Sequence, residues 1–323
     1  MTVRLAVATR TDVGRVRPGN EDAFLVADDA SLVAVADGMG GHQAGEVASA
    51  TAIAALRDGM DRGESIADAI TGANDAVWGM AADDLALRGM GTTITAGVLD
   101  GATLLIGHVG DSRAYLLRAG ELRQLTTDHS VIAELIAAGE LTEDQALVDP
   151  RRAMITRALG IDPAVVVAEL TVDLEPGDRL LLCSDGLTTM LRDGRIAEIL
   201  RDGADRDGVA EALVAAANAA GGADNITVVV ADVVDDDADP TPPDLPVASA
   251  SPAADEPAEI TEPVPVVDDA ALAAADDVAD ATTADDAVAE GAPVTATDDE
   301  PGPDDEATDA APRRRWWQRR PRP

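Results

Sequence analysis

Four aspartates stand at the ends of apolar runs that have the length of β-strands. Asp37, Asp111 and Asp185 each follow such a run, and Asp224 comes just before another. Strands that pack together can bring their ends to one place, and a carboxylate cluster without basic neighbours is a site for hard divalent cations. A single Asp-Gly pair after an apolar run is also an ordinary start of a turn. Four such positions together favour a metal site.

The run that ends at Asp37 shows why these ends are special. Residues 32–36 are all apolar and show no alternation, so a strand here would be buried on both faces. A glycine-rich turn follows directly, and glycine lets the backbone come close to another group and expose its carbonyls. A half-desolvated carboxylate at this point needs a cation, and no arginine lies nearby in the sequence.

Six short motifs occur along the chain. They are Thr11 to Asp22, Asp37-Gly38-Met39-Gly40-Gly41-His42, Gly91-Thr92-Thr93, Gly110-Asp111-Ser112-Arg113, Ser184-Asp185-Gly186 and Asp224-Asn225. In this order the chain resembles the metal-dependent protein phosphatases (PPM, the type-2C serine/threonine phosphatases) in their bacterial form, over about residues 4–233. The resemblance implies hydrolysis of phosphoserine and phosphothreonine in proteins by a metal-bridged hydroxide, opposing bacterial Ser/Thr kinases. Two alternatives are a non-catalytic phosphoprotein-binding or regulatory module of the same fold and a dedicated regulator of a sigma-factor pathway.

The metal ligands that the resemblance implies come from the four strand ends. Asp37 would bridge two Mn²⁺ or Mg²⁺ ions, with the Gly38 carbonyl on the second and Asp185 and Asp224 completing the first. Asp111, together with Asp185, is the candidate for a third ion. Such ions lower the pKa of a water molecule and neutralise the charge that develops on phosphoryl oxygens.

Other candidate site residues surround these ligands. Glu21 and Asp22 would act through water or hold ligands in place, and Asn225 either orients Asp224 or is a turn residue. Arg17 stands four residues before Glu21, where the resemblance places the phosphate-binding arginine, and a guanidinium gives two parallel donors to phosphate oxygens. Arg15 is its rival, since alternation along a strand can point either side chain inward.

Three histidines are candidates for the general acid that protonates the leaving group. His42 is the first candidate, but it can instead cap the helix expected from residue 44. His108 lies within a strand and is expected in the core. His129 opens a segment without strand character, residues 127–160, which we expect to form a surface lobe near the site.

The periodicity predicts an α+β fold with antiparallel sheets and outer helices. Expected strands cover residues 4–9, 24–26, 32–36, 92–99, 103–109, 114–117, 122–125, 165–172, 179–184 and 226–234, and expected helices cover 44–56, 65–87, 130–138, 142–148, 196–200 and 209–219. Asp100-Gly101 and Ala119-Gly120 predict hairpin turns, and consecutive hairpins mean antiparallel pairing. The resemblance implies an antiparallel β-sandwich of two sheets flanked by helix pairs, which agrees.

Composition divides the chain into three parts. Residues 1–234 form the expected phosphatase domain, residues 235–312 an acidic, Pro- and Ala-rich linker without aromatic residues, and residues 313–323 an Arg/Trp-rich terminus. The linker cannot bury enough apolar surface to fold, so we expect it to be disordered. The terminus is either a patch for an anionic membrane or a protein, or a solubilising tail that is attracted to the linker.

Charge and cysteine content restrict the partners and the compartment. The formal net charge of −37 argues against nucleic acid as a partner, and phosphorylated proteins are the partners that the resemblance implies. The single cysteine, Cys183, agrees with a reducing compartment and lies in an apolar run, where we expect it to pack in the core. Without a signal peptide or a long apolar run, the chain is expected to be cytoplasmic. We also expect it to be a monomer.

Overall fold

The computed structural model describes residues 2–40, 44–146, 149–203 and 205–236, which contain two antiparallel sheets. The first sheet has the strand order β1, β11, β10, β7, β8. These strands span Val3–Asp12, Ile226–Asp235, Arg179–Cys183, Arg113–Arg118 and Glu121–Gln124. The predicted hairpin at Ala119-Gly120 joins β7 to β8, where Arg118 pairs with Glu121.

The second sheet has the strand order β2, β3, β5, β6, β9, and the short strand β4 also pairs with β3. These strands span Asp22–Val26, Leu32–Met39, Ile94–Asp100, Thr103–Val109, Ala168–Asp173 and, for β4, Gly91–Thr92. The predicted Asp100-Gly101 hairpin joins β5 to β6, where Asp100 pairs with Thr103. The expected α+β class with antiparallel sheets is therefore confirmed.

Strand residues alternate between two different cores. Val229 and Leu182 face a core that the two sheets share, together with Val35 of the opposite sheet. Their neighbours Val228 and Cys183 face a second core, under helices. This two-sided burial explains why the strand sequences are apolar without alternation.

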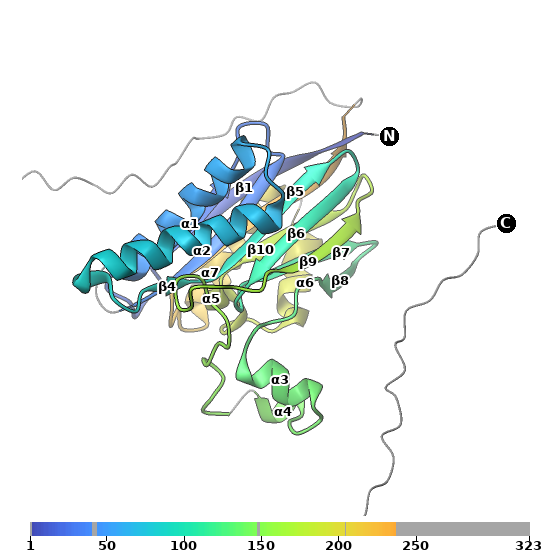
Figure 1. The fold of residues 1–323 in the computed structure, drawn as a ribbon. Helices are drawn as coiled ribbons and strands as arrows, with labels where there is room; N and C mark the ends of the chain where they lie inside the picture. The colour runs from blue at the N-terminus through green and yellow to red at the C-terminus, as the bar shows by residue number, and fades with distance from the viewer. Residues whose placement is uncertain (1, 41–43, 147–148, 204, 237–323) are drawn as a thin grey trace, which may run out of the picture. The chain divides into compact units, whose positions relative to one another are not determined.

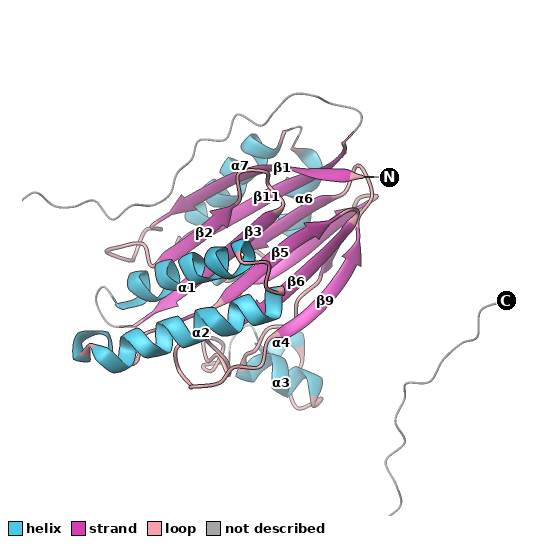
Figure 2. Cartoon of the chain, turned by 45° about the horizontal axis from the view of Figure 1, so that its top comes forward, coloured by secondary structure: helices cyan, strands magenta, loops and turns pink. Residues whose placement is uncertain are grey.

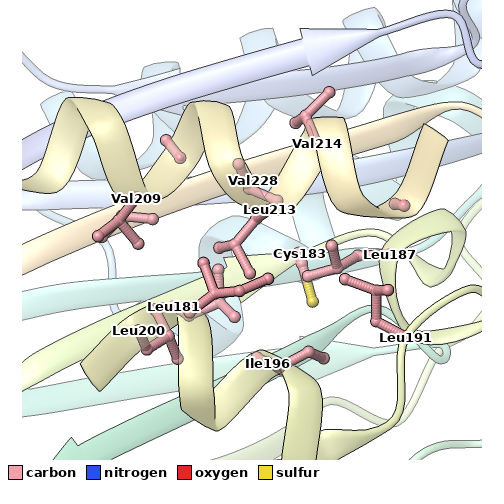
Figure 3. Packing of buried hydrophobic residues seen from close by; sticks show 14 of the residues in the cluster. Leu181, Cys183, Leu187, Leu191, Ile196, Leu200, Val209, Leu213, Val214 and Val228 are labelled. Atoms are coloured by element: carbon pink, nitrogen blue, oxygen red, sulfur yellow. The ribbon is translucent and has the colours of Figure 1, made fainter. Parts of the chain in front are cut away.

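Two pairs of helices cover the outer faces of the sheets (Figures 1 and 2). Helices α1 (Ala44–Asp61) and α2 (Ile66–Asp83) pack on the sheet that contains β3. Helices α6 (Asp193–Asp202) and α7 (Arg206–Ala219) pack on the other sheet. Figure 3 shows the core under α6 and α7, in which Cys183 is fully buried as predicted.

Side-chain caps fix where several helices begin. The Ser65 hydroxyl accepts a hydrogen bond from the Asp68 N–H at the start of α2, and the Asp205 carboxylate accepts one from the Gly208 N–H at the start of α7. The predicted single helix over 65–87 is wrong at its end. There Asp84 leaves the helical conformation and caps a separate 3₁₀ turn, η1 (Leu85–Leu87).

The segment between β8 and β9 forms the predicted surface lobe, which contains the short helices α3 (Val131–Ala137) and α4 (Glu143–Ala146). Figure 1 shows α3 and α4 projecting from one end of the sheets. The sequence did not predict α5 (Asp185–Thr188), a single turn that begins at one of the candidate ligands. No helix in the described ranges is long and apolar enough to cross a membrane.

Candidate metal centre

The candidate ligands lie at one end of the sandwich because the strands are antiparallel and in register. Asp22 begins β2 and stands directly opposite Asp37 near the end of β3. Asp185 stands two residues after the end of β10, and Asp224 stands two residues before the start of β11, the neighbour of β10 in the sheet. Asp111 follows β6 and precedes β7, so it bridges the two sheets at this same end.

Threonine side chains fix the backbone at Asp37. The Asp37 N–H donates to Thr93 Oγ1 at 3.0 Å, and the Thr92 hydroxyl donates to the Asp37 carbonyl at 2.9 Å. Thr93 Oγ1 also lies 2.7 Å from Ser112 Oγ. The Gly91-Thr92-Thr93 motif therefore holds the end of β3 and links it to the loop of Asp111.

The loops of Asp185 and Asp224 are held against each other. Gly186 lies so close to the backbone of Asn225 that a Cβ there would stand 1.9 Å from the Asn225 carbonyl oxygen. Beside it, the Ser184 hydroxyl donates to Asp22 Oδ2 at 2.8 Å and accepts from the Thr227 N–H at 3.0 Å. One serine therefore ties the ends of β10, β11 and β2 together.

Asn225 organises the loop that carries Arg17. Its carboxamide oxygen accepts from the Glu21 N–H at 2.8 Å, and its amide nitrogen donates to the carbonyls of Val13 and Gly19, each at 2.9 Å. Its own N–H donates to Asp224 Oδ1 at 2.9 Å. The side chain of Asn225 thus positions the loop of Arg17, whereas its contact with Asp224 is made by the backbone N–H, so a role of the side chain in orienting Asp224 stays a prediction.

The carboxylates at this end raise the pKa values of one another. Burial raises the pKa of Asp22 and of Asp111 to about 7 each, with a contribution from Asp185 in both cases. Burial raises the pKa of Asp37 well above its usual range, followed by repulsion from Asp22, Asp185 and other carboxylates. The pKa of Asp185 is raised by burial and then by Asp224. The site is therefore short of positive charge.

Arg17 is the cation that contacts this cluster. Its Nη2 donates to Asp224 Oδ2 at 2.7 Å, while the side chain remains 48% exposed. The rival Arg15 is anchored differently, since its backbone N–H donates to the Gly222 carbonyl at 2.7 Å. Burial raises the pKa of Glu21, and Arg17 opposes that shift. These contacts favour Arg17 as the guanidinium that faces the site.

The chemistry of these side chains fits hard divalent cations. Oδ1 of Asp22 is buried and has no hydrogen-bond partner among the described residues. No three of the described His, Cys, Asp or Glu side chains lie close enough together to hold one ion. Instead, Asp224 faces Arg17 and Asp22 faces Ser184. An oxygen-only set of mutually repelling carboxylates suits Mn²⁺ and Mg²⁺, but Asp224 would have to turn from Arg17 toward the ions.

The candidate histidines occupy different environments. His108 is buried as predicted, and burial lowers its pKa to about 3, so its ring is neutral at pH 7. His129 begins the lobe and stacks on His108, with ring centroids 4.8 Å apart. His42 lies outside the described residues.

Sequence reasoning missed some of the residues that support the site. Ser184 and Thr93 were part of the quoted motifs, and their place beside Asp185 and opposite Asp37 was the available signal. Arg113 also belongs to a quoted motif, but its partner was not predicted: its guanidinium binds both carboxylate oxygens of Asp128, at 2.7–3.1 Å. Nothing in the sequence points to a pair 15 residues apart.

Comparisons with known proteins point to one family. A family model described as "Protein phosphatase 2C" matches residues 17–217. The chain is 40% identical over 234 residues to the serine/threonine phosphatase stp of Listeria monocytogenes, a match that covers 68% of this chain and 93% of stp. It is 43% identical over 254 residues to the serine/threonine protein phosphatase PstP of Mycobacterium tuberculosis, which covers 76% of this chain and 48% of PstP.

Solved structures show the same architecture. The crystal structure of the M. tuberculosis phosphatase PstP superposes with a TM-score of 0.68 at 41% identity, covering 73% of this chain and all of that one. The catalytic domain of PstP in complex with two manganese ions gives a TM-score of 0.67 at 41% identity, covering 72% of this chain. The likeness therefore extends to a protein that binds metal.

Proposed function

Because the chain belongs to the protein phosphatase 2C family, we propose that it is a metal-dependent phosphatase that hydrolyses phosphoserine and phosphothreonine in proteins. The observation that carries this proposal is that Asp22, Asp37, Asp111 and Asp185 all lie at the same end of the sandwich. Each of their pKa values is raised by burial, and other carboxylates raise it further. The non-catalytic alternative would be favoured by the loss of a ligand, and all the candidate ligands are present.

The proposed ligands keep their assigned roles. Asp37, the Gly38 carbonyl, Asp185 and Asp224 would hold two ions, and Asp111 with Asp185 would hold a third. Manganese is supported by the PstP complex, and magnesium is proposed beside it. When bound, such ions activate water and neutralise charge on phosphoryl oxygens. Glu21 and Asp22 would keep these ligands in position, since Asp22 is tied to Ser184 and Glu21 to Asn225.

Arg17 is proposed to bind the phosphate of the substrate. Its guanidinium is half-exposed and now lies on Asp224, so it can exchange one oxyanion partner for another without leaving the site. Two parallel N–H donors orient a phosphate as well as neutralise it. Asn225 supports this role because it fixes both ends of the loop that carries Arg17.

The leaving alkoxide needs a proton, and the described histidines do not suit that task. His108 is buried with a pKa of about 3, so it carries no proton to give at neutral pH. His129 uses Nδ1 to accept a hydrogen bond from the Gly110 N–H at 3.0 Å, which fixes it in the wall of the lobe. We therefore keep His42 as the proposed general acid.

The proposed setting follows from the resemblance and the composition. Substrates would be bacterial Ser/Thr kinases and the proteins that they phosphorylate, and the chain would act as a cytoplasmic monomer in signal transduction. The single, buried Cys183 supports a reducing compartment. Contact of residues 313–323 with an anionic membrane or a protein is also proposed. Residues 313–323 and the proposed disordered linker lie outside the described residues.

Chelation followed by metal add-back tests the proposal directly. We expect the purified chain to release phosphate from a phosphothreonine peptide and from p-nitrophenyl phosphate with Mn²⁺ or Mg²⁺. EDTA should abolish both reactions, and added Mn²⁺ should restore them. EDTA that is already saturated with Mn²⁺ is the control for the chelator itself. Hydrolysis that continues at full rate in excess EDTA would contradict the proposed chemistry.

A further inference from the structure

His129 joins the lobe to the loop of Asp111 through two reciprocal hydrogen bonds. Its backbone N–H donates to the Gly110 carbonyl at 2.7 Å, and the Gly110 N–H donates back to Nδ1 of the His129 ring at 3.0 Å. The ring also stacks on the buried ring of His108, with 26° between the planes. These contacts fix the direction in which the opposite ring nitrogen, Nε2, points.

The hydrogen bonds also decide which nitrogen of His129 carries the proton. A backbone N–H only donates, so Nδ1 must accept from Gly110. In a neutral imidazole the other nitrogen is then protonated, and Nε2 is an N–H donor. Burial lowers the pKa of His129, and the nearby charge of Arg157 lowers it further, so the neutral ring is the form present at pH 7.

Arg157 places a second donor beside the first. Its Nη1 lies 3.1 Å from Nε2 of His129, and a guanidinium has no acceptor, so these two groups cannot satisfy each other. In the described part of the chain, the remaining acceptor near this nitrogen is the Val166 carbonyl at 3.5 Å, and none of the ion pairs there includes Arg157. The nearby Asp128 is held by Arg113. Two N–H groups therefore lie side by side at an exposed position, and the Val166 carbonyl, at 3.5 Å from one of them, is only a distant acceptor.

We propose that Arg157 and the Nε2–H of His129 form a subsite for a carboxylate of the protein substrate, near its phosphorylated residue. This inference rests on the proposed phosphatase function. A carboxylate offers two oxygens in one plane, so it can accept from both donors at once. The formal charge of −37 repels acidic substrates in general, and a local pair of donors would offset that repulsion where the peptide binds.

The position of the subsite suits a substrate side chain next to the phosphorylated residue better than it suits the reacting phosphate. His129 contacts Gly110, the residue directly before Asp111, so the subsite borders the candidate metal centre. It belongs to the lobe, whereas Arg17 contacts Asp224 from a separate loop. One guanidinium would hold the phosphate and the other a flanking acidic residue, which would give the enzyme a preference for acidic sequences.

Peptide selectivity tests the subsite. Two phosphothreonine peptides would differ only in their flanking residues, glutamates in one and glutamines in the other. The measured quantity is the ratio of kcat/KM for the Glu peptide to that for the Gln peptide, with Mn²⁺ present. We expect Arg157→Gln to lower this ratio about tenfold, on the scale of one charge-assisted hydrogen bond, and Arg157→Lys to lower it less.

Arg151→Gln is the matched control, because it removes the same charge from the same lobe. The Arg151 guanidinium is already bound to Asp149, with contacts of 2.8 and 2.9 Å, so the ratio should stay that of the unaltered protein. An equal fall in both variants would mean a general charge effect and would overturn the subsite. A ratio that Arg157→Gln leaves unchanged would do the same. A chain that hydrolyses neither peptide nor p-nitrophenyl phosphate would instead contradict the phosphatase function, and this inference with it.

Discussion

Strand β10 has an aspartate at each end, Asp178 buried and Asp185 half-buried, and the two have opposite kinds of neighbours. Asp178 precedes the strand and has a side chain that is 2% exposed. It accepts from Arg118 Nε at 2.8 Å and from the Glu175 N–H at 2.9 Å. Asp185 follows the strand, and its pKa is raised by burial and by Asp224. A carboxylate at one end is neutralised by arginine, and at the other end carboxylates gather.

The same contrast holds for the neighbouring strand β11. Near its end, Asp232 binds Arg179, whose Nη1 also donates to the last carbonyls of α6, at Leu200 and Gly203. A hollow of about 710 Å³ lies at this end, and its lining includes Asp178, Arg179 and Asp232 but none of the candidate ligands. Before β11, Asp224 shares the single guanidinium of Arg17 with a cluster of carboxylates.

The difference shows how a fold separates stability from chemistry. A buried carboxylate without a partner is costly, and it persists only where something outside the chain neutralises it. At the end formed by Asp178 and Asp232, arginines neutralise the carboxylates, which are structural. Divalent ions are proposed for the other end, where they would replace the missing positive charge. Substitutions at the two ends should therefore have opposite consequences.

Asp37→Asn should give the largest effect. We expect turnover of p-nitrophenyl phosphate to fall at least about 10²-fold, the scale of losing one key electrostatic group. In EDTA at pH 8 the melting temperature should not fall. The raised pKa of Asp37 means that the folded state favours the protonated form, so ionisation costs stability above the unfolded value, and asparagine removes that cost.

Asp100→Asn is the control for this substitution. It makes the same chemical change in the exposed hairpin between β5 and β6, at the other end of β5 from Thr93. Turnover should then equal that of the unaltered protein. Two outcomes would contradict the proposed difference between the ligand end and the arginine-paired end of the sandwich. In one, the Asp37→Asn variant keeps its activity; in the other, it is inactive only because it melts at a lower temperature in EDTA.

Asp178→Asn should show the reverse pattern, with stability lost and chemistry retained. Removing this carboxylate takes away the buried partner of Arg118 and leaves it the exposed Glu175 and the Asp173 carbonyl, so we expect the free energy of unfolding to fall by about 2 kcal/mol. Urea denaturation measures the change, and p-nitrophenyl phosphate turnover of the folded variant should stay unchanged. In the exposed pair of Arg195 and Glu198, Glu198→Gln should cost less than about 0.5 kcal/mol. Equal losses for the two variants would contradict the importance of burial.

The strand ends that carry the candidate ligands could be predicted from the sequence. Apolar runs that end at Asp37, Asp111 and Asp185 predicted strand ends, and the hairpins at Asp100-Gly101 and Ala119-Gly120 predicted antiparallel pairing. Both signals are local, since a strand and its turn occupy adjacent residues. The burial of the core strands on both faces was also evident from their composition.

What the sequence did not show is which distant groups meet. Alternation tells which face a residue occupies but not which strand lies beside it, so the place of β10 between β7 and β11 was not predicted. The contact of Ser184 with Asp22 joins residues 162 positions apart, and that of Arg157 with His129 joins residues 28 apart. Such contacts depend on tertiary packing, which a single sequence does not encode in its local pattern.

The smallest effect is expected from removing residues 239–323, which lie outside the described residues. The three hydrophobic clusters of the described residues, and all the candidate ligands, lie before this point. The removed segment has 21 acidic residues against 6 arginines, a composition that does not build a core. Turnover of p-nitrophenyl phosphate and the melting temperature should therefore stay nearly unchanged.

A second truncation makes this prediction sharp. Ending the chain after Val228 also removes most of β11, which pairs with β1 on one side and β10 on the other. That strand supplies Val229, Ala231 and Val233 to the core between the sheets, so we expect the shorter chain not to fold. If the chain that ends at residue 238 lost turnover while keeping its melting temperature, residues 239–323 would take part in the chemistry. If it lost both, the domain would extend beyond residue 234, and the paired end of the sandwich would need residues from that segment.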